Sequence, residues 1–131
     1  MRSKRAIQAL FFVAAAYDGV LGAVFLFASG PLFEWVAVTP PNRPGYVHFS
    51  AALLIVFAVM FTAVALHPVK NRCLIPYGIL LKVSYCSVVI FHWVTAGVPN
   101  MWKPFCIADL VFMILFTWAL AAIKKEAEED R

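Results

Sequence analysis

The sequence predicts an all-α integral membrane protein, an antiparallel bundle of four transmembrane helices with both termini in the cytoplasm. Apolar residues make up 63% of the 131 residues, against about 45–50% in ordinary globular domains. A chain this short has too little interior to bury them all. They form four long segments, and most of the charged residues lie in short clusters between these segments. The excess apolar surface is therefore expected to face a lipid bilayer.

Each apolar segment has the length that a membrane-spanning helix requires. The segments cover residues 6–28, 46–66, 74–96 and 104–123. About 20 residues at 1.5 Å rise per residue cross a hydrocarbon core of about 30 Å. Strands of a membrane barrel would be about 10 residues long with alternating polarity. Helices are expected, because a backbone in lipid must satisfy its own hydrogen bonds.

The start and the connections fit a single transmembrane domain over residues 1–131. The first segment is longer than the apolar region of a signal peptide, about 7–15 residues, so it is predicted to be retained as a helix. The outer loop, 29–45, carries four prolines and two glycines, which disfavour a continuing helix. Its amphipathic stretch LFEWVAV predicts a short helix at the membrane surface. The later connections, 67–72 and 97–103, are short, so consecutive helices are expected to be neighbours.

The orientation follows from lysine and arginine. Only Arg43 and Lys103 lie on one side of the predicted membrane, and eight basic residues lie on the other, which is therefore cytoplasmic. These eight are Arg2, Lys4, Arg5, Lys70, Arg72, Lys124, Lys125 and Arg131. The formal charge of +4 is interpreted as this topology signal, and no basic face predicts nucleic-acid binding. The three cysteines show no spacing typical of a disulfide framework or a metal site.

The candidate functional residues are polar side chains inside the apolar segments. They are Tyr17, Asp18, His48, Lys82, Tyr85, His92 and Asp109. A charge near the bilayer centre costs at least about 2.5–3.5 kcal/mol, so these side chains should face the bundle interior and have partners. Glycines 19 and 22, beside Asp18, would let another helix or a ligand approach closely.

Depth along the helices predicts two clusters. Counting residues from the outer helix ends places Asp18 and Lys82 together near the midplane, and Asp109, His48 and His92 together near the outer mouth. In the third helix Lys82, Tyr85, Val89 and His92 share one face. These side chains would line a polar pocket that opens outward and binds a small amphipathic or lipid-like ligand.

Several alternatives remain open at this stage. The Asp18–Lys82 pair could serve only to fix helix pairing, and His48 and His92 could be interfacial residues. The same groups would suit a membrane enzyme performing acid–base chemistry, isomerase-like, on a lipidic substrate. Two histidines at similar depth could ligate haem. A proton- or ion-coupled transporter, a homodimer and a structural subunit of a membrane complex are further alternatives.

Three stretches resemble the DoxX-like group of small four-helix bacterial membrane proteins. They are YDG in the first helix, PPNRPGY in the outer loop and NRCLIPYGILLKVSYC around the third helix. The resemblance covers most of the chain and lies in size, helix count and layout. It implies a multi-pass protein of the inner (cytoplasmic) membrane, and some members of that group are associated with quinone-linked oxidation of sulfur compounds. Quinone is therefore one expected ligand.

Overall fold

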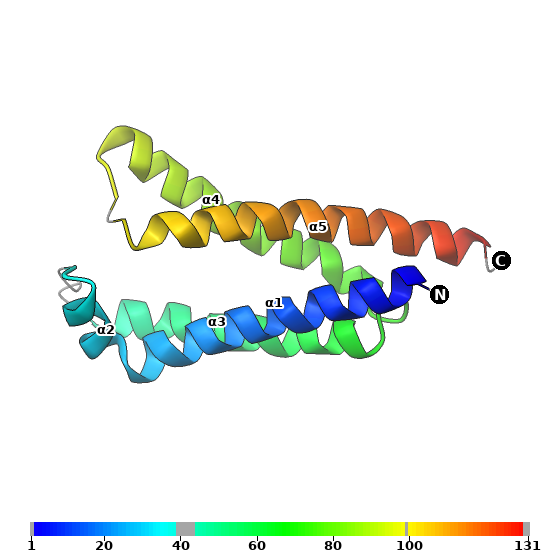
Figure 1. Ribbon diagram of the computed structural model, residues 1–131, viewed down its shortest axis with the longest axis horizontal. Helices are drawn as coiled ribbons and strands as arrows, with labels where there is room; N and C mark the ends of the chain where they lie inside the picture. The colour runs from blue at the N-terminus through cyan, green and yellow to red at the C-terminus, as the bar shows by residue number, and fades with distance from the viewer. Residues whose placement is uncertain (1, 39–43, 99, 130–131) are drawn as a thin grey trace.

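The computed structural model describes residues 2–38, 44–98 and 100–129, and within these ranges the chain is helical with no strand. Four long helices and one short helix follow one another along the chain (Figure 1). They are α1 (Arg2–Phe27), α2 (Ser29–Trp35), α3 (Pro44–Leu66), α4 (Ile75–Thr95) and α5 (Trp102–Glu129), with a 3₁₀ turn over Arg72–Leu74 before α4.

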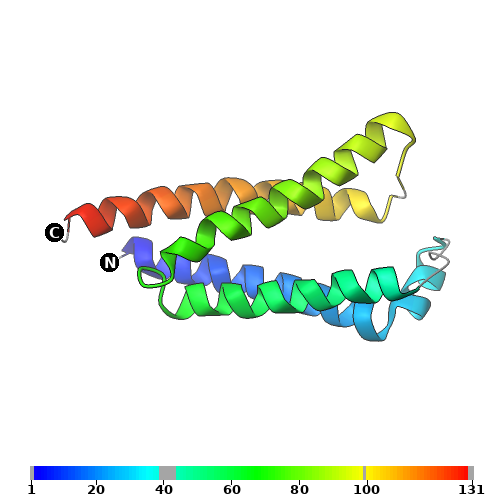
Figure 2. The ribbon, with the colours of Figure 1, turned by 180° about the vertical axis from the view of Figure 1, so that it is seen from behind.

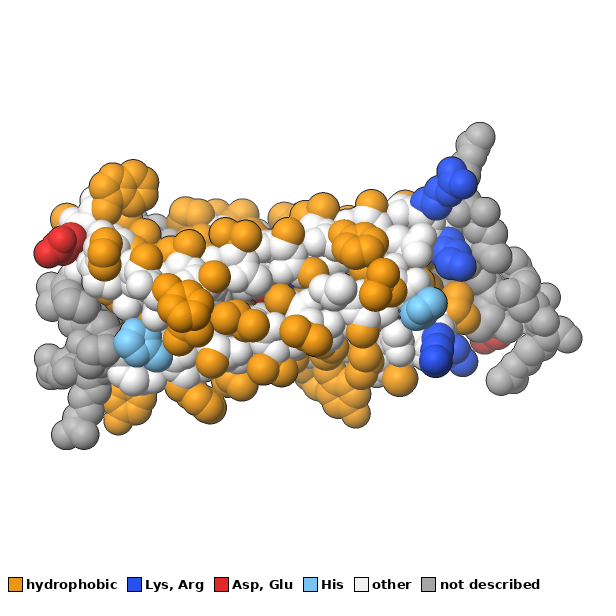
Figure 3. Space-filling view, turned by 90° about the horizontal axis from the view of Figure 1, so that it is seen from below, with side chains coloured by type: hydrophobic (Ala, Val, Ile, Leu, Met, Phe, Trp, Pro, Cys, Tyr) orange, Lys and Arg blue, Asp and Glu red, His pale blue; other side chains and the backbone are white. Residues whose placement is uncertain are grey.

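The four long helices are long and apolar enough to cross a membrane, which confirms the predicted all-α chain with four spans. Figure 3 shows apolar side chains along the middle of the molecule and Lys and Arg side chains gathered at one end. The chain is therefore a multi-pass membrane protein, because its apolar middle suits contact with lipid and its basic side chains lie at one end, as is typical of residues next to a membrane.

Several helix boundaries differ from the sequence prediction. A short helix forms in the region where one was expected, but α2 begins at Ser29 and so includes Gly30 and Pro31. A proline in the first turn of a helix is tolerated because the N–H it lacks has no intrahelical partner there. The same reason allows α3 to begin at Pro44. At the other end of the chain, α5 continues beyond residue 123 to Glu129.

The long helices pack as two pairs, α1 with α3 and α4 with α5. The first pair is close because Gly22 of α1 has no side chain. A Cβ at this position would lie 2.8 Å from the carbonyl oxygen of Ala51 and 2.9 Å from Cγ1 of Ile55. The prediction that a glycine near Asp18 allows close helix approach is confirmed, and the neighbouring element is α3.

The two pairs meet at the end where α1 begins and α5 ends. There Phe11, Phe61 and Phe116 pack against one another in a fully buried core. Gly78 of α4 packs against the Phe61 ring, where a Cβ would lie 2.7 Å from Cε1. Toward the opposite end α4 diverges from α3, as the two opposed views show (Figures 1 and 2). One half of the bundle is therefore closed by aromatic packing, whereas in the other half α3 and α4 separate and Phe25 of α1 still packs against Trp102 of α5.

Candidate functional site

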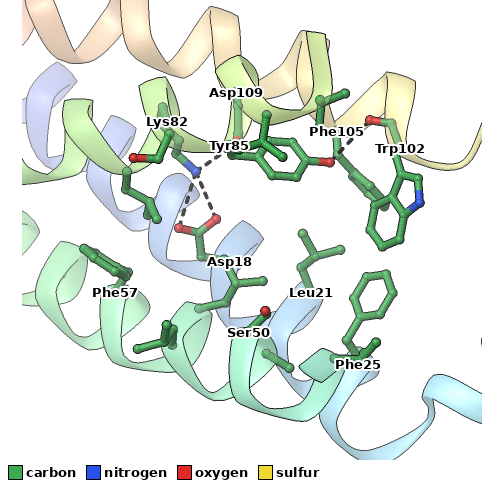
Figure 4. Close-up of a pocket in the computed structure, with 18 of the residues that line it drawn as sticks. Asp18, Leu21, Phe25, Ser50, Phe57, Lys82, Tyr85, Trp102, Phe105 and Asp109 are labelled. Carbon is green, nitrogen blue, oxygen red and sulfur yellow. Dashed lines mark hydrogen bonds and ion pairs between the residues drawn. The ribbon is translucent and has the colours of Figure 1, made fainter. Parts of the chain in front are cut away.

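A cluster of three charged side chains lies between the two helix pairs. Lys82 of α4 donates from Nζ to Asp18 of α1, at 3.0 Å from Oδ1 and 3.3 Å from Oδ2, and to Oδ1 of Asp109 in α5 at 3.1 Å (Figure 4). The three side chains come from three helices. The cluster therefore connects α1 to both helices of the α4–α5 pair.

Three aromatic rings also lie close to the Lys82 ammonium. Its Nζ lies 5.2 Å from the ring centroid of Phe112, 5.5 Å from that of Tyr17 and 5.7 Å from that of Phe61. Such rings attract a cation through their electron-rich faces. Because Phe61 also belongs to the closed aromatic core, the cluster lies at the boundary between the packed half of the bundle and the half in which α3 and α4 separate.

The three charges are not equally accessible. The side chains of Lys82 and Asp18 are each 1% exposed, whereas that of Asp109 is 10% exposed. Lys82 contacts both oxygens of Asp18 but only Oδ1 of Asp109. Among the described residues no side chain donates to Oδ2 of Asp109. The part of the cluster that remains available to another molecule is therefore a carboxylate oxygen.

A cavity of about 770 Å³ borders this cluster on the side where α3 and α4 separate. Its volume lies within the range of about 300–1,000 Å³ typical of ligand sites. All four long helices line it, with Asp18, Lys82 and Asp109 at its inner end (Figure 4). Tyr17 also lines the cavity, and its hydroxyl is buried and has no hydrogen-bond partner among the described residues.

The cavity is open at the side between α3 and α4. Tyr46 and Leu53 of α3 and Val88 and His92 of α4 all line the cavity and are also exposed. Leu53 and Val88 belong to the apolar middle of their helices. The opening therefore faces the apolar surroundings of the bundle, where a molecule dissolved in the bilayer would reach it.

Two parts of the predicted site are confirmed. Asp18 and Lys82 form a buried ion pair. The face of the third predicted helix is also correct, because Lys82, Tyr85, Val89 and His92 all line the cavity. Tyr85 is further fixed by a 3.3 Å hydrogen bond from its hydroxyl to the carbonyl oxygen of Trp102.

The predicted outer cluster of Asp109, His48 and His92 is wrong for His48, whereas Asp109 and His92 both line the cavity. Asp109 also contacts Lys82, because it lies about two turns inside α5 and the long Lys82 side chain spans the remaining distance. His48 does not line the cavity. Its Nε2 lies 3.5 Å from Oγ of Ser29, the first residue of α2. At 100° per residue, His48 is about 200° around α3 from the cavity-lining Tyr46.

Sequence reasoning missed the aromatic wall of the cavity. Phe25 of α1 stacks on Trp102 of α5 with ring centroids 5.6 Å apart, and Phe105 lies 6.4 Å from each of these rings. The spacing from Asp109 could have indicated two of them. Phe105 and Trp102 precede it by four and seven residues and therefore share its helix face.

The structure offers no shared site for the two histidines that were considered as haem ligands, since His92 lines the cavity and His48 does not. Across the described ranges no group of three or more His, Cys, Asp or Glu residues is placed to hold a metal ion. Cys86 and Cys106 are free, buried thiols in the α4–α5 interface, with Sγ of Cys86 3.6 Å from the carbonyl oxygen of Cys106. They lie behind the cavity wall rather than in it.

Comparison with known proteins found no family model, curated protein or solved structure that matches the chain.

Proposed function

We propose that this membrane protein binds a small amphipathic or lipid-like molecule in the cavity between its two helix pairs. One observation supports this proposal above the others: the buried Asp18–Lys82–Asp109 cluster borders a cavity of about 770 Å³. The cluster would hold the polar head of the ligand, and the aromatic wall would pack against its apolar part.

If the charged cluster served only to pair helices, each of its polar atoms would be expected to have a partner within the protein. Buried ion pairs that fix helix pairing need compensation on all sides, since an unpaired charge in a low dielectric is costly. Here Asp109 keeps a free oxygen beside the cavity, and the Tyr17 hydroxyl has no described partner. The free oxygen of Asp109 would gain a hydrogen bond from a bound molecule.

We further propose an antiparallel bundle with both termini in the cytoplasm of a bacterial-type inner membrane. The argument is the accumulation of Lys and Arg at the end where α1 begins. Under the positive-inside rule this end is cytoplasmic. The cavity then lies in the outer half of the bilayer, with its side opening between α3 and α4 facing lipid.

The test is photolabelling with a neutral, membrane-soluble alkyl diazirine alcohol. Detergent-purified protein should show saturable labelling that excess unlabelled alcohol displaces. The triple variant Asp18→Asn/Lys82→Met/Asp109→Asn removes the charges at nearly constant volume and should lose this displaceable fraction. Glu34→Gln, the same kind of change on exposed α2, is the matched control and should label like the wild type. Equal displaceable labelling of wild type and triple variant would refute the proposal.

A second candidate is acid–base chemistry on a lipidic substrate. The free oxygen of Asp109 supports it, because this oxygen could accept a proton from a molecule in the cavity. The resemblance to the DoxX-like group and the binding of a quinone both remain predictions from the sequence. A quinone would be a neutral member of the proposed ligand class.

A further inference from the structure

We propose that the natural ligand is a lipid-soluble organic cation, a largely apolar molecule with a single positive charge. This inference rests on the proposed binding function and specifies the chemistry of the ligand. It follows from the charge balance of the cluster, from the identity of its accessible atom and from the aromatic wall.

The cluster has an unbalanced charge. When both acids are ionised, one ammonium faces two carboxylates, which leaves one negative charge. Among the described residues that line the cavity, the only other side chain of the Asp, Glu, Lys, Arg or His types is the exposed His92. A monocation would make the cluster neutral, whereas an anion would place a second negative charge in a region of low dielectric.

The atom of the cluster that a ligand can reach belongs to a carboxylate, whose negative charge attracts a cation. Lys82, the group that would attract an anion, is 1% exposed and is occupied by both acids. Asp109 is the more exposed member, and its Oδ2 accepts no hydrogen bond from any side chain in the described ranges. A ligand that enters the cavity therefore meets a carboxylate before it meets the ammonium. Lys82 acts as a positioning residue that holds the two acids together.

The walls of the cavity suit the same class of ligand. Tyr17, Phe25, Tyr85, Trp102 and Phe105 all line it. Faces of such rings attract cations, by about 0.5–1 kcal/mol at exposed sites and more when water is excluded. The side opening between α3 and α4 faces the apolar part of the bundle surface, so the ligand must also be soluble in lipid.

The experiment compares two ions of nearly equal size and shape, tetraphenylphosphonium and tetraphenylborate, which differ in the sign of their charge. Equilibrium dialysis against detergent-purified wild-type protein should give at least tenfold tighter binding of the phosphonium. Asp109→Asn neutralises the cluster while keeping the Asp18–Lys82 pair. It should weaken phosphonium binding about tenfold, which corresponds to about 1.4 kcal/mol. The control Glu34→Gln removes an exposed carboxylate on α2 and should leave phosphonium binding unchanged.

The outcomes separate this inference from the proposed function. Equal or tighter binding of tetraphenylborate by the wild-type protein overturns the inference, whether or not the variant folds. So does phosphonium binding that is unaffected by Asp109→Asn. If neither ion binds but the neutral diazirine alcohol still labels the cavity displaceably, the inference fails and the proposed function stands. If no probe binds displaceably, both fail.

Discussion

Removal of the Lys82 ammonium alone should destabilise the protein more than removal of all three charges. Lys82 has oxygens of Asp18 and Asp109 at 3.0 Å and 3.1 Å from its Nζ. In Lys82→Met the two carboxylates face each other without compensation. The two Nζ distances place these oxygens at most about 6 Å apart, so at an effective dielectric constant of about 20 their repulsion is at least about 3 kcal/mol. Breaking a buried ion pair by deleting one partner typically costs about 3–5 kcal/mol, which agrees with this estimate.

The neutral triple variant Asp18→Asn/Lys82→Met/Asp109→Asn should behave differently. Replacing a whole buried charge cluster with neutral groups of similar volume is often tolerated. We expect the free energy of unfolding of the triple variant to lie within about 2 kcal/mol of the wild type, because it leaves no buried charge unpaired.

The structure supplies a convenient assay for this comparison. Cys86 and Cys106 are buried, whereas Cys73 is exposed. In a Cys73→Ser background, maleimide should therefore react only when the α4–α5 interface opens. Titration with SDS in mixed micelles, followed by thiol reactivity, gives the free energy of unfolding for each variant. The reasoning is refuted if Lys82→Met is as stable as the wild type, or if the triple variant is as unstable as Lys82→Met.

Two further predictions concern packing and topology. Gly22→Ala should destabilise the α1–α3 pair by about 1–3 kcal/mol in the same unfolding assay, because the new Cβ would lie 2.8 Å from the carbonyl oxygen of Ala51. Its control is Gly19→Ala on the same helix, whose Cβ would meet that of Ala58 at 3.5 Å and should be neutral or stabilising; equal losses would contradict this account. Cys73, which follows the first residue of the 3₁₀ turn at the basic end, should react with a membrane-impermeant maleimide in inside-out vesicles and not in right-side-out vesicles. The reverse pattern would invert the topology.

The sequence predicted correctly those features that depend only on the length of the apolar segments and on how deep a residue lies along its helix. Four apolar segments of spanning length predicted the four long helices. Counting residues inward along the first and third segments placed Asp18 and Lys82 at compatible depths, and the ion pair is present. An ionic side chain has few alternatives in lipid except another ionic side chain.

The errors arose where helix rotation and tilt decide the structure. Counting residues to estimate depth assumes that every helix is perpendicular to the membrane, and it placed Asp109 near the outer end of the bundle. The count also ignored the length of the Lys82 side chain. The prediction for His48 failed because the close approach of α1 and α3 at Gly22 helps set which face of α3 meets the cavity. The side opening depends on the divergence of α4 from α3, which no local pattern in either helix encodes.

The position of the photolabel tests the central claim most directly. Peptide mass spectrometry of protein labelled with the neutral diazirine alcohol should place the displaceable adducts on cavity-lining side chains such as Tyr85 and Trp102. Labelling of exposed apolar residues such as Val20 and Val94, which do not line the cavity, should not be displaceable. Displaceable adducts confined to Val20, Val94 and similar surface positions would contradict the account, because the cavity would then hold no ligand.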